Sequence, residues 1–220
     1  MRAGRGAICG LAAALGLMLV GCRALAALGV LVTPPKMQKA EVELTAGGLA
    51  IVTDYARPGQ VNPVFDSTLH RRIEELLRDN KVASRVVPYD EVVRLQQANP
   101  DFGTWSVQRV GRELGAEQVL HLRIDDLRLR ETPGDPVVTP SVELHAKVVA
   151  AGESATQARA WPDRKAEPEG RRVNHSRPAH EADTRDAIDA ETAKLAREAA
   201  YLVARHFYEY DTEDSLPREP

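Results

Sequence analysis

Alternating hydrophobic and polar residues mark two neighbouring strands in the middle of the chain. Apolar residues at 120, 122 and 124 alternate with polar ones, and the same period of two continues at 142–148. This pattern is typical of half-buried strands. The connection between them contains Pro133, Gly134 and Pro136, which predicts an antiparallel hairpin with a longer loop. After Asp125-Asp126 the apolar parity switches, which predicts a β-bulge.

Helical periodicity predicts four helices, each with a recognisable start or stop residue. They run from a cap at Asp66 to Asn80, from a cap at Asp90 to Asn99, from a cap at Ser106 to Gly115, and from Asp183 or Thr184 to about Tyr208. In the last and longest, Leu195 and Val203 fall on an inward, apolar face.

Further strands are expected at 49–55, around Val86-Val87 and at 158–161. Residues 162–183 show neither period and predict a polar surface insertion. The resulting order is β-α-β-α-α-β-β-β-α. It predicts an α/β domain whose mixed β-sheet has a βαβ start, a β-meander and a long C-terminal amphipathic helix packed on the sheet.

The first 22 residues have the organisation of an export signal. Arg2 and Arg5 precede an uninterrupted apolar stretch at 7–20, too short to span a bilayer comfortably. The stretch leads into Leu19-Val20-Gly21-Cys22, which resembles a bacterial lipobox. That resemblance implies cleavage before Cys22 and a diacylated thiol. Two alternatives stay open: an uncleaved signal anchor that includes the second apolar run at 24–32, and ordinary cleaved secretion.

These boundaries predict four parts. They are a lipoprotein signal peptide at 1–21, a lipidated N-terminus and tether at 22–44, a single α/β domain at 45–210, and an acidic tail at 211–220.

Composition narrows the class of protein. Charged residues make up 28% and hydrophobic residues 43%, which excludes both a multi-span membrane protein and wholesale disorder. The net charge of -3 gives no general nucleic-acid signal. Cys9 and Cys22 are the only cysteines, so a mature chain with a lipidated Cys22 has no free thiol and no disulfide.

Three segments carry a resemblance to a group of envelope lipoprotein domains. They are the strand at 49–55, the helix at 66–80 and the stretch VQRVGRELGAEQVL at 107–120. Together with the meander and the last helix, they resemble LpoB, the N-terminal domain of TolB and the curli-secretion lipoproteins over roughly residues 45–210. The resemblance is one of pattern and contains no catalytic signature. It implies a binding or regulatory module of the cell envelope.

Catalytic and metal motifs are missing from the sequence, which has no phosphate-binding glycine loop, HExxH, CxxC or GxSxG. No cofactor and no metal are therefore expected. His175 and His180 form a metal pair only with Glu181 or Asp183 as a further ligand, and a solvated loop is the simpler interpretation. Asp125 and Asp126 are a possible carboxylate pair, but consecutive strand residues point to opposite faces.

His121 and His145 occupy the polar faces of the two neighbouring strands. A periplasmic hydrolase that uses them with a carboxylate is one hypothesis. The preferred interpretation is a sheet face on which Arg123 meets Glu143 and both histidines are solvated.

Basic residues occur in two groups, one in the first helix and one in the polar insertion: Arg71, Arg72 and Arg78, and Arg164, Lys165, Arg171, Arg172 and Arg177. Nearby acids offset both groups. A contact of these residues with anionic headgroups or cell-wall polymer is an alternative, and plain solvation is the preferred interpretation.

The sequence thus predicts a non-enzymatic, lipid-anchored protein that binds or regulates another envelope protein, with the membrane contacted through Cys22. The alternative is an auxiliary lipoprotein of a transport or secretion machine. Arg23 follows the lipidated cysteine where an aspartate would retain a lipoprotein at the inner membrane. By its resemblance to the sorting signals of enteric lipoproteins, this residue implies that the protein is anchored at the periplasmic face of the outer membrane. Partner identity and oligomeric state do not follow from the sequence.

Overall fold

The computed structural model describes residues 36–45, 47–132, 134–152 and 158–213. Cys22 and the signal segment lie outside this range, as do residues 214–220 of the acidic tail. Within the described residues, no helix is long and apolar enough to cross a membrane.

Contacts between Cα atoms divide the chain into two units. The smaller includes Lys36, Met37 and Asp211–Glu213, and here the backbone N–H and the hydroxyl of Thr212 both donate to the carbonyl of Lys36, at 2.9 and 3.0 Å. Strands β1 (Met37–Gln38) and β9 (Tyr210–Asp211) form a two-stranded sheet. The larger unit runs from Gln38 to Tyr210 and contains every other element.

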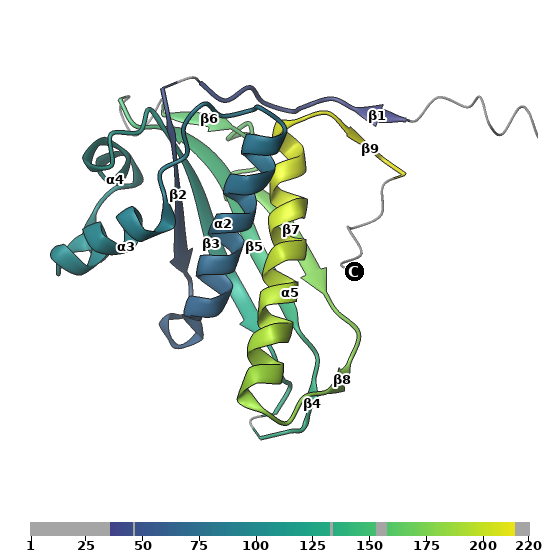
Figure 1. The fold of residues 1–220 in the computed structure, drawn as a ribbon. Helices are drawn as coiled ribbons and strands as arrows, with labels where there is room; N and C mark the ends of the chain where they lie inside the picture. The colour runs from purple at the N-terminus through teal and green to yellow at the C-terminus, as the bar shows by residue number, and fades with distance from the viewer. Residues whose placement is uncertain (1–35, 46, 133, 153–157, 214–220) are drawn as a thin grey trace, which may run out of the picture. The chain divides into compact units, whose positions relative to one another are not determined.

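A mixed five-stranded sheet forms the centre of the larger unit (Figure 1). Its strands are β2 (Leu49–Tyr55), β3 (Gln118–Arg128), β5 (Ser141–Ala150), β6 (Arg159–Trp161) and β7 (Arg171–Ser176). β2 pairs with β3 in parallel and β3 with β5 antiparallel. β6 and β7 share the outer edge of β5, each antiparallel to it. A second small sheet joins β4 (Val137–Val138) to β8 (His180–Glu181).

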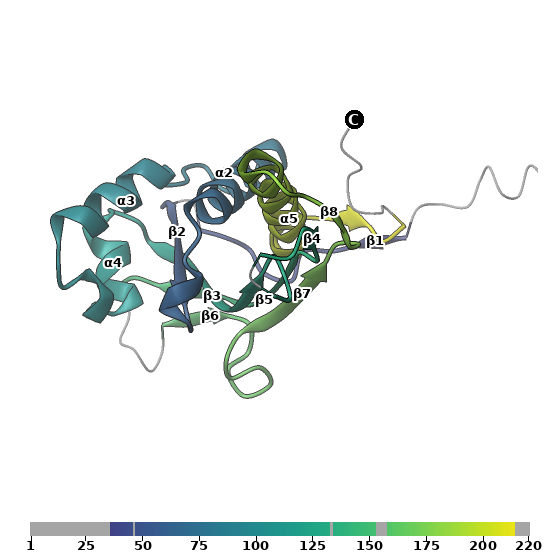
Figure 2. The same ribbon diagram turned by 90° about the horizontal axis from the view of Figure 1, so that it is seen from below.

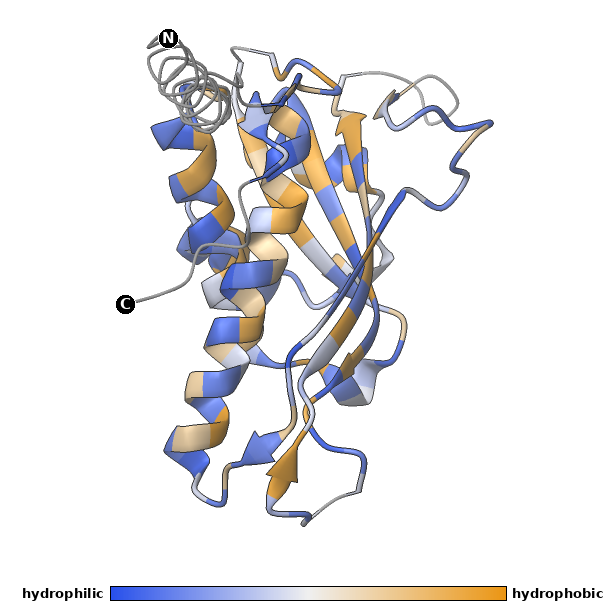
Figure 3. Ribbon diagram, turned by 90° about the vertical axis from the view of Figure 1, so that its right-hand side faces the viewer, coloured by the Kyte–Doolittle hydropathy of each residue, from blue (hydrophilic) through white to orange (hydrophobic). Residues whose placement is uncertain are grey.

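Two helices cover one face of the sheet, α2 (Pro63–Asp79) and α5 (Arg185–Ala204) (Figure 2). Their apolar stripes and the inward residues of β2, β3 and β5 form one core. Leu120, Leu122 and Leu144 of the sheet are fully buried there, as is Leu195 of α5. Figure 3 shows the hydrophobic and hydrophilic residues alternating along the strands. The predicted mixed sheet with a long packed C-terminal helix is confirmed.

A smaller core lies on the opposite face, at β2. Helices α3 (Tyr89–Ala98) and α4 (Val107–Glu113) pack there on Ala50, Val52 and Val119. Gly111 lets α4 approach closely, because a Cβ at this position would lie 2.6 Å from the Val119 side chain. Three short 3-10 helices complete the unit: η1 (Pro58–Gln60), η2 (Phe102–Thr104) and η3 (Arg205–Phe207).

Most of the predicted elements are present, with three corrections. Helix α3 begins at Tyr89 after Pro88, so Asp90 lies in its first turn and is not the cap. Helix α2 begins at Pro63 and is capped by the Asn62 side chain, which accepts from two backbone N–H groups, so Asp66 is not the cap. No strand forms around Val86-Val87, where only an isolated bridge joins Val86 to Leu49. The bulge predicted at Asp125-Asp126 is confirmed by a register shift between Ile124 and Asp126.

The expectation of a polar surface insertion at 162–183 is wrong for its second half. Strand β7 lies within it and pairs with β5 over six residues. Val173 of β7 is buried in the main core, while Arg171 and His175, on the same side of the strand, are held by acidic side chains. The polar composition therefore conceals a strand that belongs to the sheet.

The N-terminal end of the domain also starts earlier than predicted. Val42 and Leu44, expected in the tether, pack against the main core. The Glu41 carboxylate accepts hydrogen bonds from the side chains of Trp161 and Arg171. It also lies 2.9 Å from His206 Nδ1. The Glu41 backbone N–H donates to the His206 carbonyl at 2.8 Å. Hydrophobic packing and this charged cluster attach residues 41–44 to the domain.

Candidate functional site

The face of the sheet opposite α2 and α5 carries the densest arrangement of polar side chains. Because Leu122, Leu144 and Val173 point into the core, their neighbours in each strand point the other way. Over β3, β5 and β7 this places eight side chains on one surface, here called the open face: Arg123, Asp126, Arg128, Glu143, His145, Lys147, Arg172 and Asn174. Helix α4 reaches only the carboxyl end of β5 on this side, and none of the described helices lies over β7 there (Figure 2).

Arg123 is at the centre of the open face. Its Nε donates to Asp125 at 2.8 Å and its Nη1 to Glu169 at 2.6 Å, while Asp125 also binds His145 Nδ1. Arg123 lies directly opposite His145 in the register of β3 and β5. The expected contact between Arg123 and Glu143 is therefore wrong, since Glu143 pairs instead with Arg172 of β7 at 2.7 Å.

A second charged group lies where β3 bends. Asp126 accepts from Gln60 and Arg57 at 2.8 Å each, and from Arg128 at 2.5 Å. The Gln60 hydrogen bond, followed by the two guanidinium groups, lowers the pKa of Asp126. The bulge places Asp125 and Asp126 on the same face, contrary to the expectation for consecutive strand residues, but they have separate partners and do not form a carboxylate pair.

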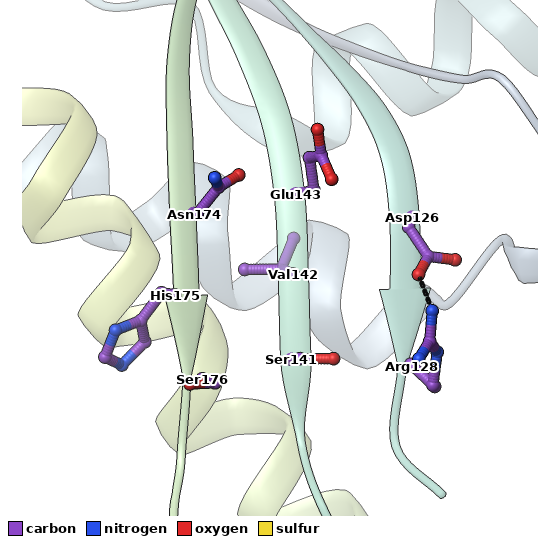
Figure 4. Close-up of a pocket in the computed structure, with 8 residues that line it drawn as sticks. All are labelled: Asp126, Arg128, Ser141, Val142, Glu143, Asn174, His175 and Ser176. Atoms are coloured by element: carbon purple, nitrogen blue, oxygen red, sulfur yellow. Dashed lines mark hydrogen bonds and ion pairs between the residues drawn. The ribbon is translucent and has the colours of Figure 1, made fainter. Parts of the chain in front are cut away.

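A hollow of about 430 Å³ lies at this end of the open face (Figure 4). The residues that line it come from three adjacent strands and are almost all polar: Asp126, Arg128, Ser141, Val142, Glu143, Asn174, His175 and Ser176. The Glu143 and Asn174 side chains lie on neighbouring strands, whereas His175 points toward α5 (Figure 4). Acids, a base, an amide and hydroxyls alternate across this shallow surface, so it offers hydrogen-bond donors and acceptors at strand spacing.

Neither histidine pair is solvated as predicted. His121 is 7% exposed, and burial, with Lys147 and Arg123 nearby, lowers its pKa to about 3. His145 is held by Asp125. His121 lies opposite Lys147 in the register, and His145 opposite Arg123. The two histidines therefore lie opposite different residues in the sheet.

His175 and His180 are also separated. His175 Nε2 lies 2.6 Å from Glu198 of α5. His180 Nε2 lies 3.4 Å from Glu191, which is nearer the start of the same helix. Arg177 binds both glutamates. No group of three metal-ligating side chains occurs among the described residues. These residues fasten β7 and β8 to α5, a role that the sequence pattern did not indicate.

A different hollow, of about 530 Å³, lies at the carboxyl end of β2. Asp66 is almost fully buried at its wall and accepts a hydrogen bond from the Tyr55 hydroxyl at 2.7 Å. Burial raises the pKa of Asp66 to about 6. The side chain that was predicted to cap the helix instead connects α2 to β2. Tyr89 and Gln96 of α3 complete the opposite wall.

Comparison with known proteins places the chain near several solved structures. No protein-family model matches it, and no curated protein matches it. The PelC dodecamer from Paraburkholderia phytofirmans aligns at a TM-score of 0.40 and 10% identity, covering 80% of this chain and 99% of that chain. Lipoprotein GNA1162 from Neisseria meningitidis aligns at a TM-score of 0.39 and 11% identity, covering 71% of this chain and 99% of that chain.

The C-terminal domain of LpoB from Salmonella enterica aligns at a TM-score of 0.30 and 14% identity, covering 61% of this chain and 84% of that chain. LpoB belongs to the group that the sequence resembles, and the similarity expected to bacterial lipoproteins is thus found among solved structures. All three likenesses are distant.

Proposed function

We propose that this chain is a lipid-anchored protein of the bacterial cell envelope that binds another envelope protein through its open face, without catalysis. The observation that supports this proposal is that the open face consists mainly of charged side chains held on adjacent strands. Its charged side chains stand on a rigid sheet, and many are partly exposed, with Arg172 at 59% and Glu143 at 36%.

The physical reason is charge complementarity. Partly exposed ion pairs contribute little to the stability of a protein. They add specificity and speed of association when a partner presents the matching charges. A surface built from strands fixes these charges at regular spacing, which favours recognition of one arrangement over others. A stable complex would bury about 800 Å² on each partner.

The anchor supports the same role. Two or three acyl chains on Cys22 would hold the protein firmly at a membrane. Since Glu41 is attached to the domain, 18 residues lie between it and Cys22, and a fully extended chain over this stretch spans at most about 68 Å. The tether would confine the open face to this distance from the membrane surface and so raise the effective concentration of a partner in the same membrane. We propose the periplasmic face of the outer membrane as that location.

The binding role can be tested by exchanging charges on the open face. Full-length tagged protein is isolated from its own cells in mild detergent, as wild type, Arg172→Glu, Glu143→Arg and the double variant. Both single variants should lose the co-purifying partner. The double variant restores the internal ion pair with its direction reversed, so it should regain stability but not the partner. A partner retained by all three variants would place binding elsewhere.

The anchor is tested separately by the intact mass of the mature protein. The expected mass is that of the chain from residue 22 plus diacylglycerol, with or without a further acyl group. An unmodified chain from residue 22 or later would reject lipidation, and a full-length mass would support the signal anchor. Cys22→Ala should abolish the modification and leave an uncleaved precursor or a released protein.

A further inference from the structure

A cationic hollow lies at the opposite end of the open face from the charged group around Asp126. It measures about 200 Å³ and lies between α4 and the strands β5 and β6. Three basic side chains line it, Lys147, Arg159 and Arg164, together with Gln108 of α4. No acidic side chain lines it among the described residues.

The cations in this hollow lack the partners that other basic residues of the molecule have. Among the described residues, neither Lys147 nor Arg164 takes part in an ion pair. Two acids that act electrostatically on Arg159 already have their own partners, since Glu169 binds Arg123 and Glu167 binds Arg171. Burial and the neighbouring Arg159 and Arg123 lower the pKa of Lys147. Like charges are thus gathered in a partly enclosed space, which costs free energy unless an anion is present.

Arg159 provides the more specific observation. Its Nη1 donates to the Pro168 carbonyl at 2.7 Å, which orients the guanidinium group. The other two nitrogens, Nε and Nη2, are shielded from solvent and have no hydrogen-bond partner among the described residues. These two atoms form the edge with which arginine binds carboxylates and phosphates through two parallel hydrogen bonds. Buried donors without acceptors are uncommon in folded proteins and call for an explanation.

His121, which does not itself line the hollow, has a further polar atom without a partner. It lies directly opposite Lys147 in the register of β3 and β5, on the same face, and is more than nine-tenths buried. Its Nδ1 has no hydrogen-bond partner in the described structure. A neutral imidazole can carry its proton on this nitrogen and donate it.

From these observations we propose that the hollow binds a phosphate-class anion, held by Lys147, Arg159 and Arg164. A small reorientation of Arg159 would turn its free edge toward the anion, and Lys147 would supply a point charge. The volume suits one phosphoryl group with part of its substituent rather than a large molecule. The ligand is therefore free phosphate, a phosphate monoester or the headgroup of an anionic lipid.

The test uses the full-length protein in a nonionic detergent and needs no partner, so its result is independent of the proposed function. Unfolding temperature is measured against increasing inorganic phosphate, with sodium chloride at equal ionic strength as the reference. Phosphate should raise Tm with the logarithm of its concentration above Kd, by roughly 5 to 10 °C at a concentration a hundredfold above Kd. A rise that chloride reproduces in full would overturn the proposal.

Two variants locate the effect. Lys147→Met keeps the aliphatic stem, and Arg159→Met removes the free edge. Each should leave the Tm without phosphate unchanged or higher, because like charges are separated, and should weaken the phosphate response at least tenfold. The matched control, Arg94→Gln on α3, alters a side chain that is 73% exposed and should respond like wild type. An undiminished response in both site variants would contradict the proposal.

A measurement on wild-type protein covers the case in which a variant does not fold. Phosphate should shift the backbone amide NMR signals of Val107, Gln108 and Lys147 more than those of β7. Shifts confined to β7, or none, would count against the site. Short-chain phosphatidylglycerol in place of phosphate separates the sources: a tighter response to the lipid assigns a headgroup, and a tighter response to phosphate assigns a soluble ligand.

Discussion

The two faces of the central sheet show how one strand can serve two purposes. On the covered face of β5, Val142, Leu144, Ala146 and Val148 are all buried against α2 and α5. On the open face the intervening residues are charged or titratable and only partly buried. The covered face supplies the hydrophobic free energy of folding. The open face contributes much less to stability, so its side chains can be arranged for recognition.

Deleting residues 164–180 should have the largest effect. The deletion removes β7, which supplies Val173 to the core and occupies half of the outer edge of β5. We expect loss of cooperative unfolding and of soluble expression. Deleting only Lys165 and Ala166, which are exposed in the same loop, should leave a folded protein. Circular dichroism during thermal unfolding measures both, and a stable protein without 164–180 would show that β7 is dispensable.

The substitution Leu195→Asp should have the next largest effect on stability. Leu195 is fully buried between α5 and the sheet, so the variant places a charge without a partner in the covered face. We expect a loss of about 3 to 5 kcal/mol in the free energy of unfolding. Asn174→Asp, an exposed residue of the open face, should stay within about 0.5 kcal/mol of wild type. Equal losses in the free energy of unfolding for the two variants, measured by denaturant titration, would show that the two faces contribute equally to stability.

Acid should destabilise the domain through the buried His121. The folded state keeps this side chain neutral, with a pKa of about 3, whereas the unfolded chain takes up a proton below the ordinary pKa of 6.5. Stability is therefore full above pH 6.5 and falls as pH decreases toward 3, by about 2 kcal/mol between pH 6.5 and 5. His121→Gln should reduce this slope by one proton, as measured by denaturant titration at both pH values. An unchanged slope would mean that His121 is not buried as the fold places it.

The smallest effect should come from exchanging Glu143 and Arg172. Their ion pair is partly exposed, and such pairs are worth less than about 1 kcal/mol. Stability of the double variant should lie within that amount of wild type. A larger loss would show that the open face contributes to folding more than its exposure indicates.

The regular elements could be predicted because each has a clean period. The alternation in β3 and β5 marks the covered face, and Ser106 and Thr184 cap their helices as side-chain acceptors. Strand β7 could not be found in this way, since Arg171 and His175 stand on its covered side. Their charges are satisfied by Glu41 and Glu198, which lie far away in sequence. Only Gly170 gave a local signal, because a Cβ there would lie 2.7 Å from the Ala146 carbonyl oxygen.

The sites were harder to predict than the fold for the same reason. Sequence reasoning found His121, His145 and the acids of the bulge, but their partners depend on register across three strands. The alternation at 142–148 places Lys147 on the polar side of its strand, but no pattern in the sequence marks Lys147 or Arg159 as a ligand. Whether a charge has a partner is decided by contacts between residues distant in the chain, which a period of two does not contain.

Site-specific photo-crosslinking in the native cells tests the central claim most directly. A photoreactive amino acid is placed at Asn174 on the open face, or at Glu75, an exposed residue of α2 on the covered side of the sheet. Binding through the open face predicts a discrete crosslinked protein from position 174 and none from position 75. Crosslinks from position 75 alone would contradict the account.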